Sequence, residues 1–450
     1  MPDPMQLPHE LRLMIMNHAT DEVDRMLCNM SLVSKRWHAI LIEQIYSCWQ
    51  QYAYNRNPIS SMWKFLRTIL SNRQIADTVR EIRYSSFELS GGRYSHSSKR
   101  PTLSRGDYDM IQKAICRAGL DHLKPYVIEA INNADPRPLL ALLLANLRNL
   151  QTLHACLPDS DVILAEVFRE AVKCKQNLRN GFSPLHNLRE VYLDGMPWVC
   201  NECKRSHHIH VTLLWPIFQL PAIHRVSVSN FKPHEGASRA KYSKDFGYVF
   251  EASTVTDLNL AVDTSSNPCL GTPDSFILFA LPKRLARLSV YLKGYNSTIS
   301  NTDIWNAIQP YEGSIEYLDI DRHDHCRETD NSKLGSMRGF KRLERLYIQP
   351  RLLNDKDSLG DTLPPNCQSL NFYFDGRFSF SKTFIQQLQD FIPSTHLHVP
   401  NLWHIVLDRS GYLISRDFLL YDQMEDSCTK YGIKFEAKLL SKYGKGPRHW

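Results

Sequence analysis

Apolar and polar positions recur along most of this chain in one repeated unit. The unit is an apolar residue, two others, an apolar residue, one other and a third apolar residue. Copies begin at Leu150, Leu188, Ile223, Val255, Leu285, Ile315, Leu343, Cys367 and Leu402, and an earlier copy is expected at Val79. The starts lie between 24 residues (Leu343 to Cys367) and 38 residues (Leu150 to Leu188) apart. Irregular spacing in this range indicates a repeat array.

Each unit predicts one short strand, and helical segments are expected between many of them. Thr302 is the expected cap of a helix over 304–308, and Ser381 of one over 384–391. A single strand and helix cannot bury their apolar faces alone, so the copies must stack. The pattern therefore favours an α/β fold, a curved solenoid with a parallel sheet inside and helices outside. An ordinary α/β domain stays open as the alternative.

Apolar residues outside these units also recur at helical or strand spacing. Residues 59–70 carry a helical apolar stripe, 79–84 alternate as a strand does, and 139–144 are apolar all round, as in a buried helix. Residues 85–106 are rich in Ser, Gly and Arg, which predicts a loop. A helix over 417–430 and a strand over 433–439 are expected to close the array.

The first fifty residues predict short amphipathic helices. Pro8 suits a first helical turn, and Leu11 and Ile15 follow at helical spacing. A second helical segment, capped by Asp21, is expected from Met26 to Leu41. Helices this short bury little surface alone, so they gain stability from a partner or from the downstream domain.

These residues resemble a known family. Leu7-Pro8-x-Glu10-Leu11-x-x-x-Ile15, followed by Leu27-x-x-Met30-x-x-Val33-Ser34-Lys35-Arg36-Trp37, resembles an F-box motif of the version common in fungal proteins. The resemblance implies docking on the Skp-type adaptor of cullin-RING ubiquitin ligases. It also implies which residues line the adaptor contact or the core beneath it: Leu7, Pro8, Leu11, Ile15, Val33, Ser34 and Trp37. A generic helical pair without such a partner is the alternative.

The repeats resemble the degenerate leucine-rich repeats that often follow an F-box in fungal proteins, although the usual asparagine after the apolar core is mostly absent. The expected organisation is an F-box domain over 1–50 and a solenoid over 51–440. Within the solenoid we expect a helix-rich entry (51–147), repeats (148–416) and a cap (417–440), followed by a basic tail at 441–450.

Composition narrows the class of protein. The 450 residues are 43% hydrophobic and 22% charged, as in an ordinary globular protein, and the net charge of +7 is scattered, which argues against nucleic-acid binding. No apolar run is long enough to span a membrane, and the first residues lack a secretory signal pattern. We expect reduced, mostly buried cysteines and a place in the cytoplasm, the nucleus or both.

Two polar clusters contain residue types that bind metal ions. Cys200 and Cys203 with His207 and His210 have zinc-ligand chemistry, but the histidines follow too soon for the usual spacing, which favours an incidental loop. Asp319-x-Asp321 lacks the rest of a calcium loop and is interpreted as a polar loop leaving a strand.

No catalytic motif and no cofactor motif is present. The sequence therefore predicts a non-enzymatic receptor subunit: the F-box holds the adaptor, and the repeats bind an unidentified protein target. The alternative is a repeat scaffold without ubiquitin transfer. Candidate target-binding loops are 85–106, 195–212, 232–247 and 321–333, since loops carry function more often than cores.

Overall fold

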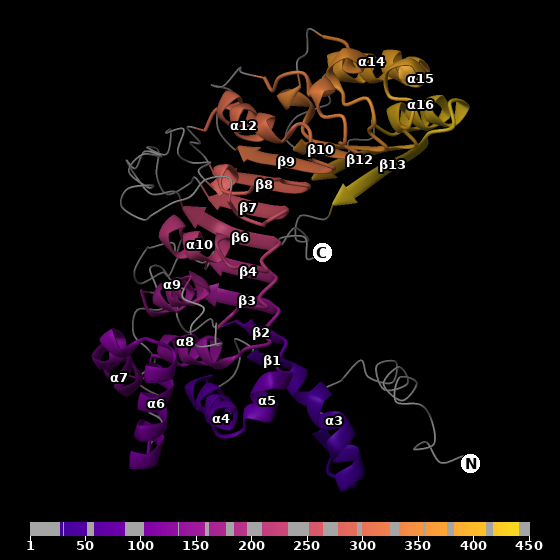
Figure 1. Ribbon diagram of the computed structural model, residues 1–450. Helices are drawn as coiled ribbons and strands as arrows, with labels where there is room; N and C mark the ends of the chain where they lie inside the picture. The colour runs from indigo at the N-terminus through magenta and orange to yellow at the C-terminus, as the bar shows by residue number, and fades with distance from the viewer. Residues whose placement is uncertain are drawn as a thin grey trace, which may run out of the picture.

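A computed structural model describes most of the chain. The described residues are 28–29, 31–51, 58–85, 103–133, 135–157, 162–176, 184–195, 209–232, 252–263, 278–294, 299–324, 333–353, 357–375, 382–410 and 417–440. They form one open, thirteen-stranded sheet in which every pairing is parallel. Figure 1 shows the strands following one another in chain order, with their arrowheads on the same side.

Strand order equals sequence order from one end of the sheet to the other, except that short β5 pairs only with β6. The strands are β1 (Cys48–Gln51), β2 (Glu81–Tyr84), β3 (Thr152–Leu157), β4 (Glu190–Gly195), β5 (Ile209–His210), β6 (Arg225–Lys232), β7 (Asp257–Asp263), β8 (Arg287–Gly294), β9 (Tyr317–Asp324), β10 (Arg345–Ile348), β11 (Ser369–Asp375), β12 (His404–Ser410) and β13 (Lys434–Leu440).

Helices connect the strands, and their lengths differ between repeats. The α-helices are α3 (Lys35–Ser47), α4 (Pro58–Ser71), α5 (Arg73–Thr78), α6 (Arg105–Arg117), α7 (Lys124–Asn132), α8 (Arg137–Asn146), α9 (Val162–Gln176), α10 (Val211–Phe218), α12 (Asn301–Ile308), α13 (Leu359–Thr362), α14 (Lys382–Phe391), α15 (Thr395–His398) and α16 (Asp417–Lys430). Between β9 and β10 the described connection holds only a 3-10 turn, Met337–Gly339.

The apolar positions of all ten predicted units are buried. The middle residue of each unit stands in register with the middle residue of its neighbours, so that one apolar column crosses the sheet: Ile82, Leu153, Val191, Val226, Leu258, Leu288, Leu318, Leu346, Leu370, Ile405 and finally Phe435. Burying one such leucine contributes about 1.5–3 kcal/mol, so stacking supplies the stability that one repeat lacks.

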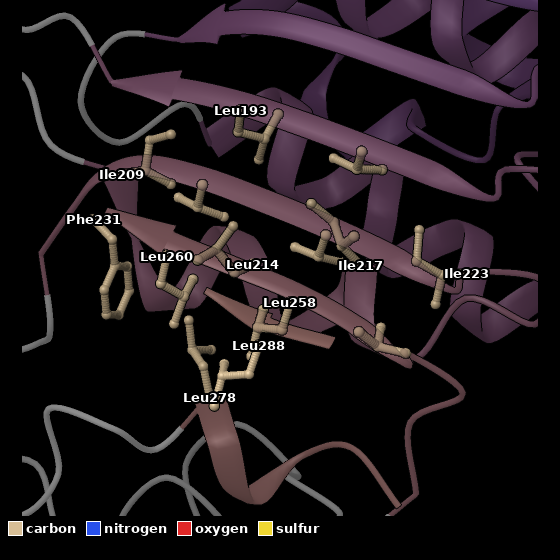
Figure 2. Packing of buried hydrophobic residues seen from close by; sticks show 14 of the residues in the cluster. Leu193, Ile209, Leu214, Ile217, Ile223, Phe231, Leu258, Leu260, Leu278 and Leu288 are labelled. Atoms are coloured by element: carbon tan, nitrogen blue, oxygen red, sulfur yellow. The ribbon is translucent and has the colours of Figure 1, made fainter. Parts of the chain in front are cut away.

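Figure 2 shows this core in the middle of the array. Leu258, Leu260 and Leu288 from the strands lie beside Leu214 and Ile217 of α10. Strand side chains alternate between faces, so the remaining strand positions point to the other side of the sheet. We call that side the open face.

Several sequence predictions are confirmed. α4 and β2 follow in the expected order, α8 is buried from Pro138 to Ala145, and α16 with β13 closes the array. The parallel sheet with helices agrees with the predicted α/β solenoid. Residues 1–27, which hold most of the expected F-box bundle, lie outside the described residues.

Other predictions were wrong in detail. The predicted loop 85–106 ends earlier, because Ser104 and Asp107 form a capping box that starts α6 at Arg105. The cap of α12 is Ser300 instead of Thr302, for the same reason. Asp319 and Asp321 do not leave the strand: β9 continues to Asp324, and both occupy open-face positions.

The cysteines agree with the prediction only in part. Six lie in the described part of the chain and all six are free thiols, but only Cys367 and Cys428 are buried, while Cys28 and Cys116 are exposed. Within the described residues, no helix combines the length and apolarity that crossing a bilayer requires.

Candidate protein-interaction site

The predicted adaptor-binding residues that the structure describes gather at the start of α3. Ser34 has an extended backbone, and its Oγ accepts a hydrogen bond from the Trp37 backbone N–H at 3.2 Å. Just before this cap, Leu32 and Val33 are 83% and 73% exposed. Two adjacent apolar side chains are thus exposed directly before α3.

The remaining predicted contacts, Leu7, Pro8, Leu11 and Ile15, lie outside the described residues. The helical segment expected from Met26 to Leu41 is not continuous in its described part, because a turn at Leu32–Val33 separates a short helical segment from α3. The Ser34 cap explains the break, since a capping residue takes extended rather than helical backbone angles.

α3 is joined directly to the sheet. Ser47 ends the helix and Cys48 begins β1, which pairs with β2. On the helix, Leu41 is fully buried. Figure 1 shows α3 at the β1 end of the strand stack. α3 is therefore anchored to the first strand of the sheet.

The open face near the N-terminal half of the sheet carries a self-contained charge network. Arg225 donates to the Asp257 carboxylate at 2.9 Å and to the Tyr192 hydroxyl at 3.2 Å, and that hydroxyl donates to Glu190 at 2.7 Å. The His154 ring stacks on Tyr192 at 4.3 Å. Burial disfavours the charged form of Arg225, but its bonds to Tyr192 and Asp257 outweigh burial and raise its pKa. The network thus supplies its own cation.

A second cluster lies on the open face of β9, β10 and β11. The rings of Tyr317 and Tyr347 are 5.2 Å apart, and those of Tyr347 and Tyr373 are 6.3 Å apart. The Asp319 carboxylate accepts from the Tyr317 hydroxyl at 3.3 Å and from the Tyr373 hydroxyl at 3.0 Å. Asn371, on the strand of Tyr373, is 4% exposed. We call these five residues the tyrosine–aspartate patch.

Sequence reasoning missed this patch. Its members stand 26 to 30 residues apart in three repeats (Tyr317, Tyr347, Tyr373), at the open-face positions that carry no repeat pattern. The one available signal was an aromatic residue beside the buried strand positions in three successive units.

Ser369, His404 and Glu436 have the residue types of an acyl-transfer triad. Ser369 and His404 are register partners on β11 and β12, whereas Glu436 lies on β13 two residues beyond Lys434, the register partner of His404. Ser369 Oγ lies 3.3 Å from His404 Nδ1, and His404 Nε2 lies 3.4 Å from Glu436 Oε1. Ser369 is 8% exposed, and the backbone N–H groups of the strands beside it belong to the sheet ladder, so the described strand residues offer its hydroxyl no oxyanion site. The geometry is that of cross-strand packing.

A cavity of about 600 Å³ lies at the turns before β7, β8 and β9. Thr254 and Ser314 line it, but their hydroxyls donate to the Ile223 and Leu285 carbonyls of the preceding repeats. Arg284, also in the lining, pairs with Glu316 at 3.6 Å. These groups tie neighbouring repeats together, so the cavity is the groove between consecutive turns.

The candidate zinc ligands fall mostly outside the described residues, namely Cys200, Cys203 and His207. The backbone of His210 ends β5, but its side chain is not described. Within the described ranges, no group of three or more His, Cys, Asp or Glu side chains is placed to hold a metal ion. Only parts of the four predicted target-binding loops belong to the described residues. Residues 321–324 of the last loop, for example, form the end of β9.

Comparison with protein-family models, curated protein sequences and solved structures gives no match to this chain.

Proposed function

We propose that this protein is the substrate-recognition subunit of a cullin-RING ubiquitin ligase. Residues before and within α3 dock on a Skp-type adaptor, and the repeat sheet binds a protein target. The observation that carries the proposal is the exposed pair Leu32 and Val33 beside the Ser34 cap, inside the stretch that resembles an F-box.

The direct junction of α3 and β1 supports the same mechanism. A receptor works by proximity, because holding adaptor and target on one body raises the local concentration of a target lysine near the activated ubiquitin. A helix continuous with the first strand keeps the two binding surfaces at a constant separation.

Pull-down with purified Skp-type adaptor tests the proposal. Replacing Leu32 and Val33 together by Asp should lower adaptor capture by at least about tenfold, because two apolar contacts are lost and two charges enter the interface. Leu397→Asp is the matched control, since Leu397 is also an exposed leucine, at 71%. Equal capture of both variants, or no capture of the unmodified chain, would refute the proposal.

The second candidate is a repeat scaffold without ubiquitin transfer, in which α3 only covers the end of the sheet. The fully buried Leu41 favours it, because α3 is packed on the solenoid. Deleting residues 1–50 does not separate the two functions, since the deletion also removes most of β1. Replacing Leu32 and Val33 does separate the two candidate functions, because this change leaves the buried contacts of α3 in place.

A further inference from the structure

Two of the repeat units carry the same basic hexapeptide. Lys-Arg-Leu-x-Arg-Leu stands at 283–288 and again at 341–346, where it leads into β8 and into β10. Its leucines are fully buried, so the core explains them. The core does not explain its cations, which are all exposed: Lys283, Arg284, Arg287, Lys341, Arg342 and Arg345. We call these six residues the basic patch.

The fold places the two hexapeptides on either side of β9. Arg287 and Arg345 are both register partners of Tyr317, the first residue of β9. Figure 1 shows β8, β9 and β10 side by side. Because neighbouring strands lie about 4.8 Å apart, equivalent residues of the two hexapeptides are about 10 Å apart. The cations therefore form two parallel columns at the start of these strands.

The charge of the patch is only partly neutralised. Arg284 and Arg342 pair with the same oxygen, Glu316 Oε1, at 3.6 Å and 2.8 Å. Glu344, inside the second hexapeptide, is the other carboxylate of these turns, so six positive and two negative side chains leave four positive charges. Among the described residues, four cations of the patch pair with no carboxylate: Lys283, Arg287, Lys341 and Arg345. An anionic ligand would neutralise them.

A groove adjoins the first column of cations. The cavity of about 600 Å³ at the turns before β7, β8 and β9 is lined by Lys283 and Arg284, together with Pro310 and Tyr311. Ion pairs between exposed groups contribute little by themselves, so a ligand bound by charge needs further contact. The groove offers such contact to the backbone of a bound chain.

We infer that the basic patch binds an acidic segment of a partner protein, an extended chain with several aspartate or glutamate side chains. Guanidinium and ammonium groups donate charge-assisted hydrogen bonds to carboxylates. On one face of an extended chain, side chains two and four residues apart are separated by about 7 and 13 Å, which brackets the separation of the two columns. The long lysine and arginine side chains cover the difference.

A nucleic acid fits this surface less well. Nucleic-acid binding draws on many cations that follow the phosphate backbone. The flanking turns, 252–256 before β7 and 363–368 before β11, contain no charged residue. Glu316 and Glu344 within the patch would also repel a continuous polyanion. A short acidic protein segment matches the extent and the charge of the patch better.

In the proposed function this segment belongs to the ubiquitination target. The patch deepens that proposal by giving the class of target, and it rests on the proposal for the fate of the bound protein. The variant with Leu32 and Val33 replaced should keep peptide binding, and variants of the patch should keep adaptor capture. Loss of one activity with retention of the other shows which proposal fails.

Fluorescence anisotropy of the full chain at low ionic strength is the test. The ligands are two labelled octapeptides, in which glycine alternates with glutamate or with lysine, and a labelled oligothymidylate of eight nucleotides. The glutamate peptide should bind most tightly, the lysine peptide should not bind measurably, and added salt should weaken binding. Arg287→Gln combined with Arg345→Gln should weaken glutamate-peptide binding about fivefold to tenfold, because two charge pairs are lost.

Lys113→Gln combined with Arg117→Gln is the matched control, because it removes two exposed positive charges from α6, near the β1 end of the sheet (Figure 1). It should bind the glutamate peptide as the unmodified chain does. Glu316→Gln releases Arg284 and Arg342 and should tighten binding, a gain that misfolding cannot produce. The inference is overturned by equal losses in the two double variants, by unchanged or weaker binding in Glu316→Gln, or by tighter binding of the lysine peptide or the oligothymidylate.

Discussion

At the residue scale, polar side chains at the turns link six of the repeats to the one before. They stand directly before the first apolar residue of a unit: Asn149, Asn187, Thr254, Ser314, Asn366 and Asn401. Asn149 Nδ2 donates to the Asp77 carbonyl at 2.8 Å, and Asn187 Nδ2 donates to Asn149 Oδ1 at 3.2 Å. Four of these six residues are asparagines.

Asn149→Ala is expected to lower the free energy of unfolding by about 1–2 kcal/mol, because the Asp77 carbonyl loses its donor and Asn187 loses its acceptor. Urea denaturation measures the change. Asn401→Ala is the control at the same repeat position: its contact with Asn366 is 3.5 Å long and exposed, so its effect should be smaller. Equal effects would contradict a structural role for these bonds.

Glu436 makes stability depend on pH. Hydrogen bonds from Lys434 and Lys438, with the charge of His404, lower its pKa from 4.5 to about 2. Its charged form therefore stabilises the folded state above pH 4.5, and this contribution disappears as the pH falls towards 2. The Glu436 side chain is 27% exposed, so solvent keeps the contribution below about 1 kcal/mol.

Glu436→Gln should accordingly unfold more easily than the unmodified chain near neutral pH, and the difference should shrink in acid. Urea denaturation at a series of pH values, with and without added salt, measures both effects. A difference that grows as the pH falls would show that the sign is wrong.

At the element scale, helix caps decided where several helices begin. In α12 the Ser300 Oγ accepts from the Asp303 backbone N–H at 3.0 Å, and the Asp303 carboxylate accepts from the Ser300 N–H at 3.0 Å. Thr302, two residues later, lies inside the helix and is exposed. Both residues match the sequence preference for a cap, and only backbone geometry separates them.

Ser300→Ala should therefore cost about 0.5–2 kcal/mol of stability, whereas Thr302→Ala should change stability little or raise it slightly, because alanine favours a helix interior. The comparison of the two unfolding midpoints is the measurement. A larger loss for Thr302→Ala would contradict the assigned cap.

At the scale of the whole molecule, each repeat is stabilised by its neighbours. The first and last repeats have a neighbour on one side only, so another element must cover their outer edges. α16 and β13 cover the last repeat: β13 pairs with β12 along seven residues, and Met424 and Cys428 of α16 are fully buried. Without them the edge of β12 would be open to pairing with another chain.

A chain shortened to residue 416 should therefore associate or aggregate, which size-exclusion chromatography with light scattering would detect. Removal of residues 441–450 alone keeps α16 and β13 and should preserve the elution of the full chain. Unchanged elution of the longer truncation would show that the cap is dispensable.

Apolar spacing was enough to predict most of the strands and their buried face, because alternation along a strand is local and each unit repeats the same spacing. β1 and β5 carry no copy of the unit and were not predicted. Leu258 and Leu318 were readable as core residues without any structure. The spacing did not determine the open face, whose residues follow no period. Tyr317, Tyr347 and Tyr373 became one patch only because the register of β9, β10 and β11 brings distant residues side by side. Tertiary structure alone decides such neighbours, since cross-strand pairing sets them and local pattern does not.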